Sequence, residues 1–358
     1  MDLNTIWFIL IGVLLIGYAV LDGFDLGVGI IHLFFETDEH RRLSLNSIGP
    51  VWDGNEVWLI TSGGALFAAF PNVYATAFSG FYLPFMVLLV ALISRAISIE
   101  FRSKEEKKGW RKSFDIAFSA GSFISSLLFG VAIGNIVVGM KIGSDMEYKG
   151  TLLDLLNPYS LMMGLFTVIV FAMHGAIYLN LKNEGELQDK VRSLAKKLYY
   201  VFLVFFVVVT AVTLWMRPEM IANFSFGKIQ SASFKLDVMN QHEFWISVFA
   251  WLIVLLNILA IANIPRTLIK GKELQCIISS GCCIAALIFL FAAGLFPDMM
   301  RSSIDSQFSL NIYNASSSLM TLKNMLIIAI IGLPFVLSYT ISIYWIFRGK
   351  TKITKHSY

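Results

Sequence analysis

The stretch AVLDGFDLGVGII, residues 19–31, lies within the first apolar segment of the chain and carries two carboxylates, Asp22 and Asp25. An ionised Asp at the centre of a bilayer costs about 2.5–3.5 kcal/mol on insertion scales, so two of them in one span require polar partners or a function. Because the two acids are three residues apart, they share one face of a helix. The three glycines of the same stretch allow a second helix to approach closely. The stretch therefore predicts a closely packed membrane helix with one polar face.

The composition of the whole chain indicates an integral membrane protein. Of its 358 residues, 57% are hydrophobic and only 15% are charged, and the mean hydropathy is +0.71. A soluble domain cannot bury so much apolar surface. No Lys or Arg precedes the first apolar run, so we expect this run to be retained as a span and not cleaved as a secretory signal. The net charge of +4 gives no indication of a nucleic-acid partner.

Nine apolar segments form a single membrane domain over residues 1–358. Most of them hold the roughly 20 residues that a helix needs to cross the hydrocarbon core of a bilayer. They cover residues 6–34, 47–70, 73–99, 113–140, 158–181, 198–216, 244–264, 276–296 and 325–347. The second segment is the least apolar, because it contains Pro50, Asp53 and Glu56. We therefore expect an all-α polytopic membrane protein with nine transmembrane helices.

The distribution of Lys and Arg decides between nine spans and eight. With nine spans, the loops on one side of the membrane hold 20 of the 28 basic residues and those on the other side hold 7, with Arg95 inside the third span. Omitting the second span changes the split to 18 against 9. The positive-inside rule therefore favours nine spans, with the N-terminus outside and the C-terminus in the cytoplasm. Because every loop is short, the function must be performed in or across the membrane, or consist of supporting a partner there.

A second pair of acids, Asp53 and Glu56, has the same three-residue spacing within VWDGNEVW, residues 51–58. Together with Asp22 and Asp25, this pair indicates a polar wall on the first two spans. Such a wall can conduct protons or a cation, or it can serve only to hydrogen-bond neighbouring helices. The residues alone leave both interpretations open.

Other polar residues of the spans favour structural roles. We expect Asn135 and His174 to hydrogen-bond to neighbouring helices, although an intramembrane histidine can also bind a haem or relay a proton. Arg95 and Glu100 are expected near the end of the third span, where they snorkel to the interface or form a pair. The basic run over residues 102–112 is expected to be a solvated loop. The five histidines are too widely spread for a metal cluster.

Seven motifs, spread over nearly the whole chain, resemble subunit II of the cytochrome bd-type quinol oxidases. The longest, VWDGNEVWLITSGGALFAAFP, covers residues 51–71 and is highly specific. The others are LIGYAVLDGFDLGVG, YATAFSGFYLPFMVLL, EFRSK, HGAIYLNLK, GLFPDMM and YNASSS. The match is densest over residues 14–104, and over residues 198–269 it lies mainly in the hydropathy.

The resemblance implies a fold and an activity. The nine helices would form two four-helix bundles plus a peripheral helix. The chain would pair with subunit I in a heterodimer of the bacterial inner membrane, where subunit I holds haem b and haem d. The complex would oxidise membrane quinol, reduce dioxygen to water and generate a proton-motive force without pumping. A small single-span third subunit, and a quinone or lipid held by this chain, remain open.

The resemblance also suggests roles for individual residues. Through the WDGN motif it assigns a proton-conduit role to Asp53, toward the oxygen-reducing haem of subunit I. Asp22, Asp25 and Glu56 are weaker candidates for the same path, and a dioxygen path through this chain remains open. The chain lacks a set of axial ligands, so we expect it to bind neither haem nor metal. Asp298 stands where many relatives have Asn, Arg or Phe, which leaves its partner open.

Two alternatives belong to other functional classes. A proton-coupled secondary transporter would also place carboxylates beside glycines within the membrane, but it predicts inverted repeats, and no clear repeat is visible. A purely structural scaffold for subunit I would use every acid only as a hydrogen-bond partner. Co-purification with a haem-bearing partner separates the transporter from both oxidase interpretations.

Overall fold

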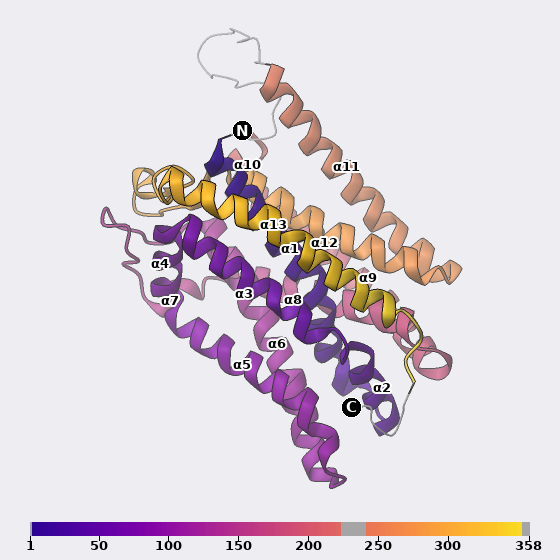
Figure 1. Ribbon diagram of the computed structural model, residues 1–358. Helices are drawn as coiled ribbons and strands as arrows, with labels where there is room; N and C mark the ends of the chain where they lie inside the picture. The colour runs from indigo at the N-terminus through magenta and orange to yellow at the C-terminus, as the bar shows by residue number, and fades with distance from the viewer. Residues whose placement is uncertain (1, 223–240, 353–358) are drawn as a thin grey trace.

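The computed structural model describes residues 2–222 and 241–352, and within these ranges the chain is largely helical (Figure 1). Its α-helices are α1 (Leu3–Ile31), α2 (Asp38–Ile48), α3 (Trp52–Ala69), α4 (Pro71–Gly80), α5 (Tyr82–Phe101), α6 (Lys108–Val138), α7 (Leu152–Leu155), α8 (Pro158–Lys182), α9 (Gly185–Met216), α10 (Glu219–Ala222), α11 (Gln241–Lys270), α12 (Glu273–Leu295) and α13 (Leu319–Ile346). Three short 3-10 helices are η1 (His32–Phe34), η2 (Arg102–Lys104) and η3 (Ser306–Phe308). Strands β1 (Asp298–Met300) and β2 (Leu310–Asn311) pair antiparallel.

Eight of the described helices are long and apolar enough to cross a membrane: α1, α5, α6, α8, α9, α11, α12 and α13. Most residues of the expected second span form α3, an 18-residue helix that is not among these eight. It runs antiparallel to α13. At one end of the pair, the amide of Ser317 donates to Ala69 O at 2.8 Å, and at the other the hydroxyl of Tyr344 donates to Asn55 Oδ1 at 2.9 Å.

The two ends of the chain lie at opposite ends of the helix bundle (Figure 1). Near the small sheet, the hydroxyl of Tyr313 donates to the carboxylate of Asp2 at 3.1 Å, and we call this the sheet end. At the other end, the amide of Thr351 donates to Lys182 O at 2.7 Å, and the Thr351 and Ser47 hydroxyls lie 3.1 Å apart. We call this the basic end, because the basic runs of η2, α6 and α9 lie there.

Capping residues define where helices begin at the sheet end. The carboxylate of Asp2 accepts the amide of Thr5 at 2.7 Å, which satisfies one of the free donors in the first turn of α1. Asn157 caps α8 by accepting the amide of Ser160 at 2.8 Å, and Pro158 occupies the first helical position, where no amide donor is needed.

Helix α1 is central to the bundle, because it packs against α3, α6, α8, α12 and α13. Its contact with α8 is made backbone to backbone. A Cβ added to Gly27 would lie 1.8 Å from Phe171 O, and one added to Gly175 would lie 2.4 Å from the carbonyl carbon of Gly27. The expected close approach of a second helix is therefore confirmed, and α8 is that helix.

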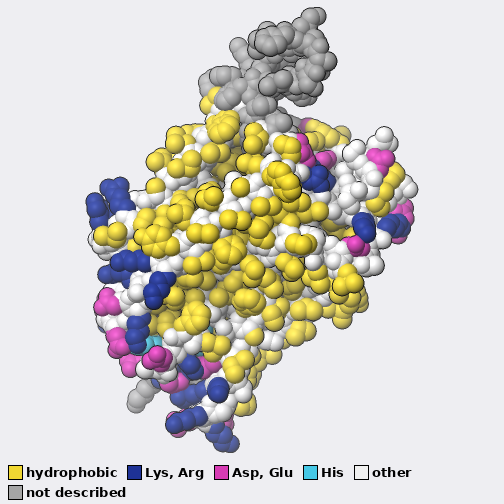
Figure 2. Space-filling model, turned by 180° about the vertical axis from the view of Figure 1, so that it is seen from behind, with side chains coloured by type: hydrophobic (Ala, Val, Ile, Leu, Met, Phe, Trp, Pro, Cys, Tyr) yellow, Lys and Arg dark blue, Asp and Glu magenta, His cyan; other side chains and the backbone are white. Residues whose placement is uncertain are grey.

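The surface of the bundle is apolar over a broad band between charged ends. Figure 2 shows this band on one face, with Lys, Arg, Asp and Glu gathered at the margins. Large apolar side chains such as Ile60, Val90 and Phe335 are exposed on it, as expected where lipid or a partner chain covers the protein.

The helices differ from the expected spans and loops most clearly at three places. The third span is interrupted at Phe81 and consists of α4 and α5. The expected loop over residues 182–197 is mostly the first part of α9, and residues 38–46 belong to α2. Hydropathy detects only the part of a helix that lies in hydrocarbon, so polar turns that extend a helix into water, or form one there, are missed.

Gly27→Ala tests the close contact of α1 with α8. The added methyl group would overlap a backbone oxygen that cannot rotate away, so we expect the free energy of unfolding to fall by about 1–3 kcal/mol. Gly12→Ala is the matched control, because it lies in the same helix with no atom within 4 Å of the added Cβ. Its thermal midpoint in detergent should be unchanged or higher. Equal midpoints for the two variants would contradict the contact.

Candidate functional site

Asp22 of α1 and Arg95 of α5 form an ion pair in the interior of the bundle. Both side chains are fully buried. Arg95 Nη1 donates to Asp22 Oδ2 at 3.2 Å, and Arg95 Nη2 donates to Asp22 Oδ1. Arg95 therefore forms a pair, one of the two expected outcomes, and does not snorkel. A fully buried guanidinium is tolerated only with a bound counter-charge, and the fork geometry of Arg suits a carboxylate.

Glu56 of α3 is the third member of this charge group. Its Oε2 lies 4.0 Å from Arg95 Nη1, and its side chain is 19% exposed. Arg95 Nε is buried and has no hydrogen-bond partner among the described residues. One cation thus lies between two carboxylates from different helices, with Asp22 on the buried side and Glu56 nearer the surface.

Asp25 has different partners from Asp22, although the two are one turn apart. Asn55 Nδ2 donates to Asp25 Oδ2 at 2.7 Å, and Tyr344 donates to Asn55 Oδ1. The second oxygen, Asp25 Oδ1, is buried without a partner in the described ranges. Asp22 therefore joins α1 to α5, whereas Asp25 joins α1 to α3 and, through Asn55, to α13.

Asp53 lies on the outer surface of α3. It is exposed, as are Gly54 and Val57, and no hydrogen bond or ion pair is recorded for it within residues 2–222 and 241–352. It belongs to the first turn of α3, where the helix dipole favours a negative charge. Of the four candidate acids, Asp53 and Glu56 reach the surface, and Asp22 and Asp25 are fully buried.

His174 and Asn135 make hydrogen bonds between helices. His174 Nε2 lies 3.0 Å from Val20 O, which can only accept, so this nitrogen carries a proton. His174 Nδ1 lies 2.7 Å from Ser280 Oγ, so both ring nitrogens are occupied. Asn135 Nδ2 donates to Leu155 O at 2.9 Å, which ties α6 to α7.

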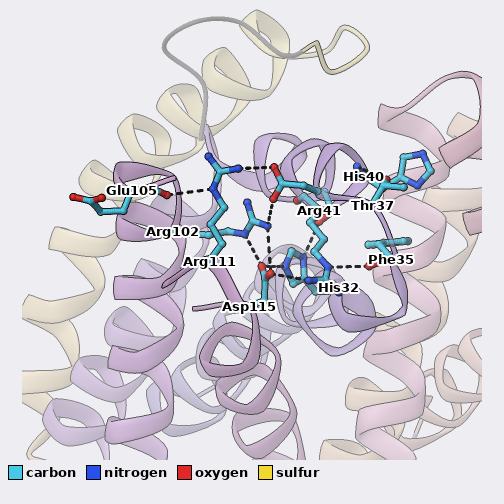
Figure 3. Close-up of polar contacts among 11 residues, drawn as sticks. His32, Phe35, Thr37, His40, Arg41, Arg102, Glu105, Arg111 and Asp115 are labelled. Atoms are coloured by element: carbon cyan, nitrogen blue, oxygen red, sulfur yellow. Dashed lines mark hydrogen bonds and ion pairs between the residues drawn. The ribbon is translucent and has the colours of Figure 1, made fainter. Parts of the chain in front are cut away.

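A second charged cluster, which the sequence reading missed, lies at the basic end (Figure 3). At its centre is the buried carboxylate of Asp115, on α6. It bonds to three side chains from other elements: His32 Nε2 at 2.7 Å, Arg41 Nη1 at 2.9 Å and Arg102 Nε. Arg102, expected in a solvated loop, is almost completely buried. One feature of the sequence indicates such a cluster: Asp115 is a lone acid in the apolar run SFDIAF.

This cluster fastens α1, α2, α5 and α6 together at the basic end. Asp38, at the start of α2, accepts from Arg102 Nη2 at 2.7 Å and from Arg111 Nη1 at 2.9 Å.

At the sheet end, Asp298 lies 3.3 Å from Arg301 Nε, which supplies the partner that the sequence left open. Burial raises the pKa of Asp298, and the guanidinium of Arg301 opposes this shift.

Neither a cluster of metal-ligating side chains nor a free histidine nitrogen is present at His32 or His174. No group of three or more His, Cys, Asp and Glu side chains in these ranges could hold a metal ion. His174 has both ring nitrogens occupied, and His32 bonds to Ser44 and Asp115.

Comparison with known proteins identifies close relatives. The family model described as "Cytochrome bd terminal oxidase subunit II" matches residues 3–347. The chain is 36% identical to cytochrome bd-I ubiquinol oxidase subunit 2 of Escherichia coli, covering 99% of this chain and 96% of that protein. It is 35% identical to cytochrome bd ubiquinol oxidase subunit 2 of Bacillus subtilis, covering 98% and 97%. The fold matches a chain of the bd oxidase from Geobacillus thermodenitrificans with a TM-score of 0.75 at 15% identity, over 97% and 98% of the two chains.

A double-mutant cycle tests the Asp22–Arg95 pair. Asp22→Asn leaves the guanidinium of Arg95 buried without its bound counter-charge, so we expect a loss of about 3–5 kcal/mol in stability. Adding Arg95→Met removes the unpaired charge and should restore part of that loss. Thermal unfolding of the purified protein measures both. If the losses of stability in Asp22→Asn alone and in Arg95→Met alone simply added up in the double variant, the pairing would be contradicted.

Proposed function

The chain belongs to the family of subunit II of the cytochrome bd terminal oxidases, and we propose that it lines a proton path to the oxygen-reducing haem of subunit I. The complex is a quinol oxidase of the bacterial inner membrane, in which electrons pass from quinol to dioxygen. The reduction of dioxygen to water consumes protons, so the haem site needs a supply of them. A secondary transporter is not favoured, since the family of the chain is an oxidase family.

The observation that carries this proposal is the position of Asp53. It is a carboxylate on the exposed face of α3, without a partner in the described part of the chain. An isolated charge facing lipid is costly, whereas a charge facing a polar partner subunit is not. The adjacent α13 supports this view, because none of its most apolar stretch is buried in the chain. We infer that subunit I covers the surface formed by α3 and α13.

The path would begin at the two acids that reach the surface. Asp53 and Glu56 lie one turn apart on α3, and carboxyl groups are among the side chains that form proton relays in membranes. A guanidinium stays protonated in proteins, so Arg95 would act as a fixed positive charge beside Glu56. Asp22 and Asp25 would link α1 to α5 and α3, and so fix the positions of the helices beside the path.

We also propose that the haems b and d are held by subunit I alone. This is supported by the occupied nitrogens of His32 and His174. A haem iron needs at least one axial ligand with a free lone pair, and the ring nitrogens of these two histidines are already engaged in hydrogen bonds. Quinol oxidation would likewise take place on subunit I.

The proposed topology has nine spans in two four-helix bundles plus a peripheral helix, with the N-terminus outside. It is supported by α3, which extends beside α13 between the two ends of the bundle. It is also supported by the opposite placement of the chain ends and by the excess of Lys and Arg on one side.

Asp53→Asn tests the proton path. Asn keeps the size and hydrogen bonding of Asp but cannot titrate, so the complex should assemble with normal haem content and turn over more slowly. Positioned proton-transfer groups contribute roughly 10²–10⁴-fold to rates, so we expect a loss of about tenfold or more at pH 9, where protons are scarce. The loss should be smaller at pH 6.

Asp189→Asn is the matched control for this experiment. Asp189 is an exposed acid of α9 at the basic end, and its replacement removes the same charge. Its oxygen consumption should follow that of the parent from pH 6 to pH 9. If Asp53→Asn also followed the parent over this range, with full assembly, Asp53 would be structural and the path would lie elsewhere.

Reporter fusions test the topology. We expect an externally active reporter to be active after Thr5 and after Asn72, and a cytoplasmic reporter to be active after Tyr358. The fusion after Asn72 follows α3, so it decides whether this helix crosses the membrane. Cytoplasmic signals at both ends of the chain would favour eight spans and contradict this topology.

A further inference from the structure

A groove on the surface of the bundle lies apart from the acidic network. It runs between α11 and α12, has a volume of about 770 Å³, and includes Ile16 of α1 in its lining. Most of the lining is apolar, with Leu256 and Leu259 from α11 and Phe289 from α12. Neither helix contributes a residue to the Asp22–Arg95 group, so the proton path does not account for this groove.

The polar lining of the groove is gathered near the basic end. On α11 the lining extends from Ile253 to Arg266, about 20 Å at 1.5 Å per residue. Arg266 lies one turn before the end of α11, and Glu273, at the start of α12, bonds to Lys350 at 2.8 Å at the basic end. The apolar remainder of the groove thus extends from this end toward the membrane interior, over about the depth of one leaflet of the 30 Å core.

Three side chains form this polar end. Asn263 Nδ2 donates to Ser279 Oγ at 2.9 Å, which links α11 to α12 and leaves the amide fixed at the groove. Arg266 is exposed, and no ion pair or hydrogen bond is recorded for its guanidinium among the described residues. A cation at the polar end of a long apolar groove is complementary to an anionic head group attached to an acyl chain.

We propose that this groove binds an anionic phospholipid of the leaflet at the basic end. Its phosphate lies on Arg266, and one acyl chain follows the groove past Leu259 toward Ile253. Guanidinium is the side chain best suited to a phosphate, because it donates two parallel hydrogen bonds. A quinone head group is neutral, so it would gain little from this charge.

The bound lipid has a structural consequence. In the described ranges, α11 packs mainly against α12 and only lightly against α9. Ile16 of α1 also lines the groove, so an acyl chain bound there would contact both α11 and the central helix. The lipid therefore adds a contact between α11 and the central helix to the packing of α11 on α12.

Photo-crosslinking of the intact complex in lipid nanodiscs tests this proposal. The probe is phosphatidylglycerol with a diazirine on one acyl chain, and peptide mass spectrometry locates the adducts. We expect adducts on residues 253–266 and 278–289. Excess unlabelled phosphatidylglycerol should suppress them, and excess phosphatidylcholine should not. Arg266→Gln should lower the yield about fivefold, the effect of one basic residue near a charged membrane surface, and Arg266→Lys should largely keep it.

Lys112→Gln is the matched control, because it removes one exposed positive charge at the basic end from α6, which does not line the groove. Its adducts should equal those of the parent, and haem content should be unchanged in all three variants. Equal competition by phosphatidylcholine, or an unchanged yield in Arg266→Gln, would overturn the proposal. Suppression by added quinone but not by phosphatidylglycerol would overturn it too, and would assign the groove to a quinone.

Discussion

The structure depends on a rule of the bilayer: a charge taken out of water must find a counter-charge or a hydrogen-bond partner. The pair of Asp22 with Arg95 follows this rule inside the chain, since both side chains are fully buried and joined by two hydrogen bonds. Either residue alone would destabilise the fold, so the pair holds α1 and α5 within reach of one long side chain. The glycine contact of α1 with α8 then fixes a second neighbour of the central helix.

The same rule divides the four acids by the partners that they find. Asp22 and Asp25 are satisfied largely within the chain, by Arg95 and Asn55, and such fixed partners suit a structural role. Glu56 has only a distant cation at 4.0 Å, and Asp53 has no partner in the described ranges. An acid that is held loosely can exchange protons, whereas one clamped by a guanidinium cannot do so without breaking the pair. The proposed path therefore uses the two acids that reach the surface.

The sequence predicted most of the helices, because an apolar run of about 20 residues has few other solutions in a membrane. It also predicted the polar face of α1 and the close approach at its glycines. It could not predict the partners. Asp22 and Arg95 are 73 residues apart, and His32 and Asp115 are 83 apart. Hydropathy and helical periodicity describe neighbours along one helix, and they contain no information about which helix lies opposite. The cluster around Asp115 was missed for this reason, although its acid stood out in an apolar run.

The unpaired acid on the surface of this chain also predicts which groups the partner subunit must supply there. If the α3–α13 surface is covered by subunit I, that subunit must bring a cation, a hydrogen-bond donor or ordered water to Asp53, since an apolar contact would leave the carboxylate buried alone. Water or a titratable donor would continue a proton path, whereas an arginine would close it by fixing the charge of Asp53. A proton-conducting interface therefore requires polar but weakly bound surroundings at this one acid, in contrast to the tight pair that Asp22 forms within the chain.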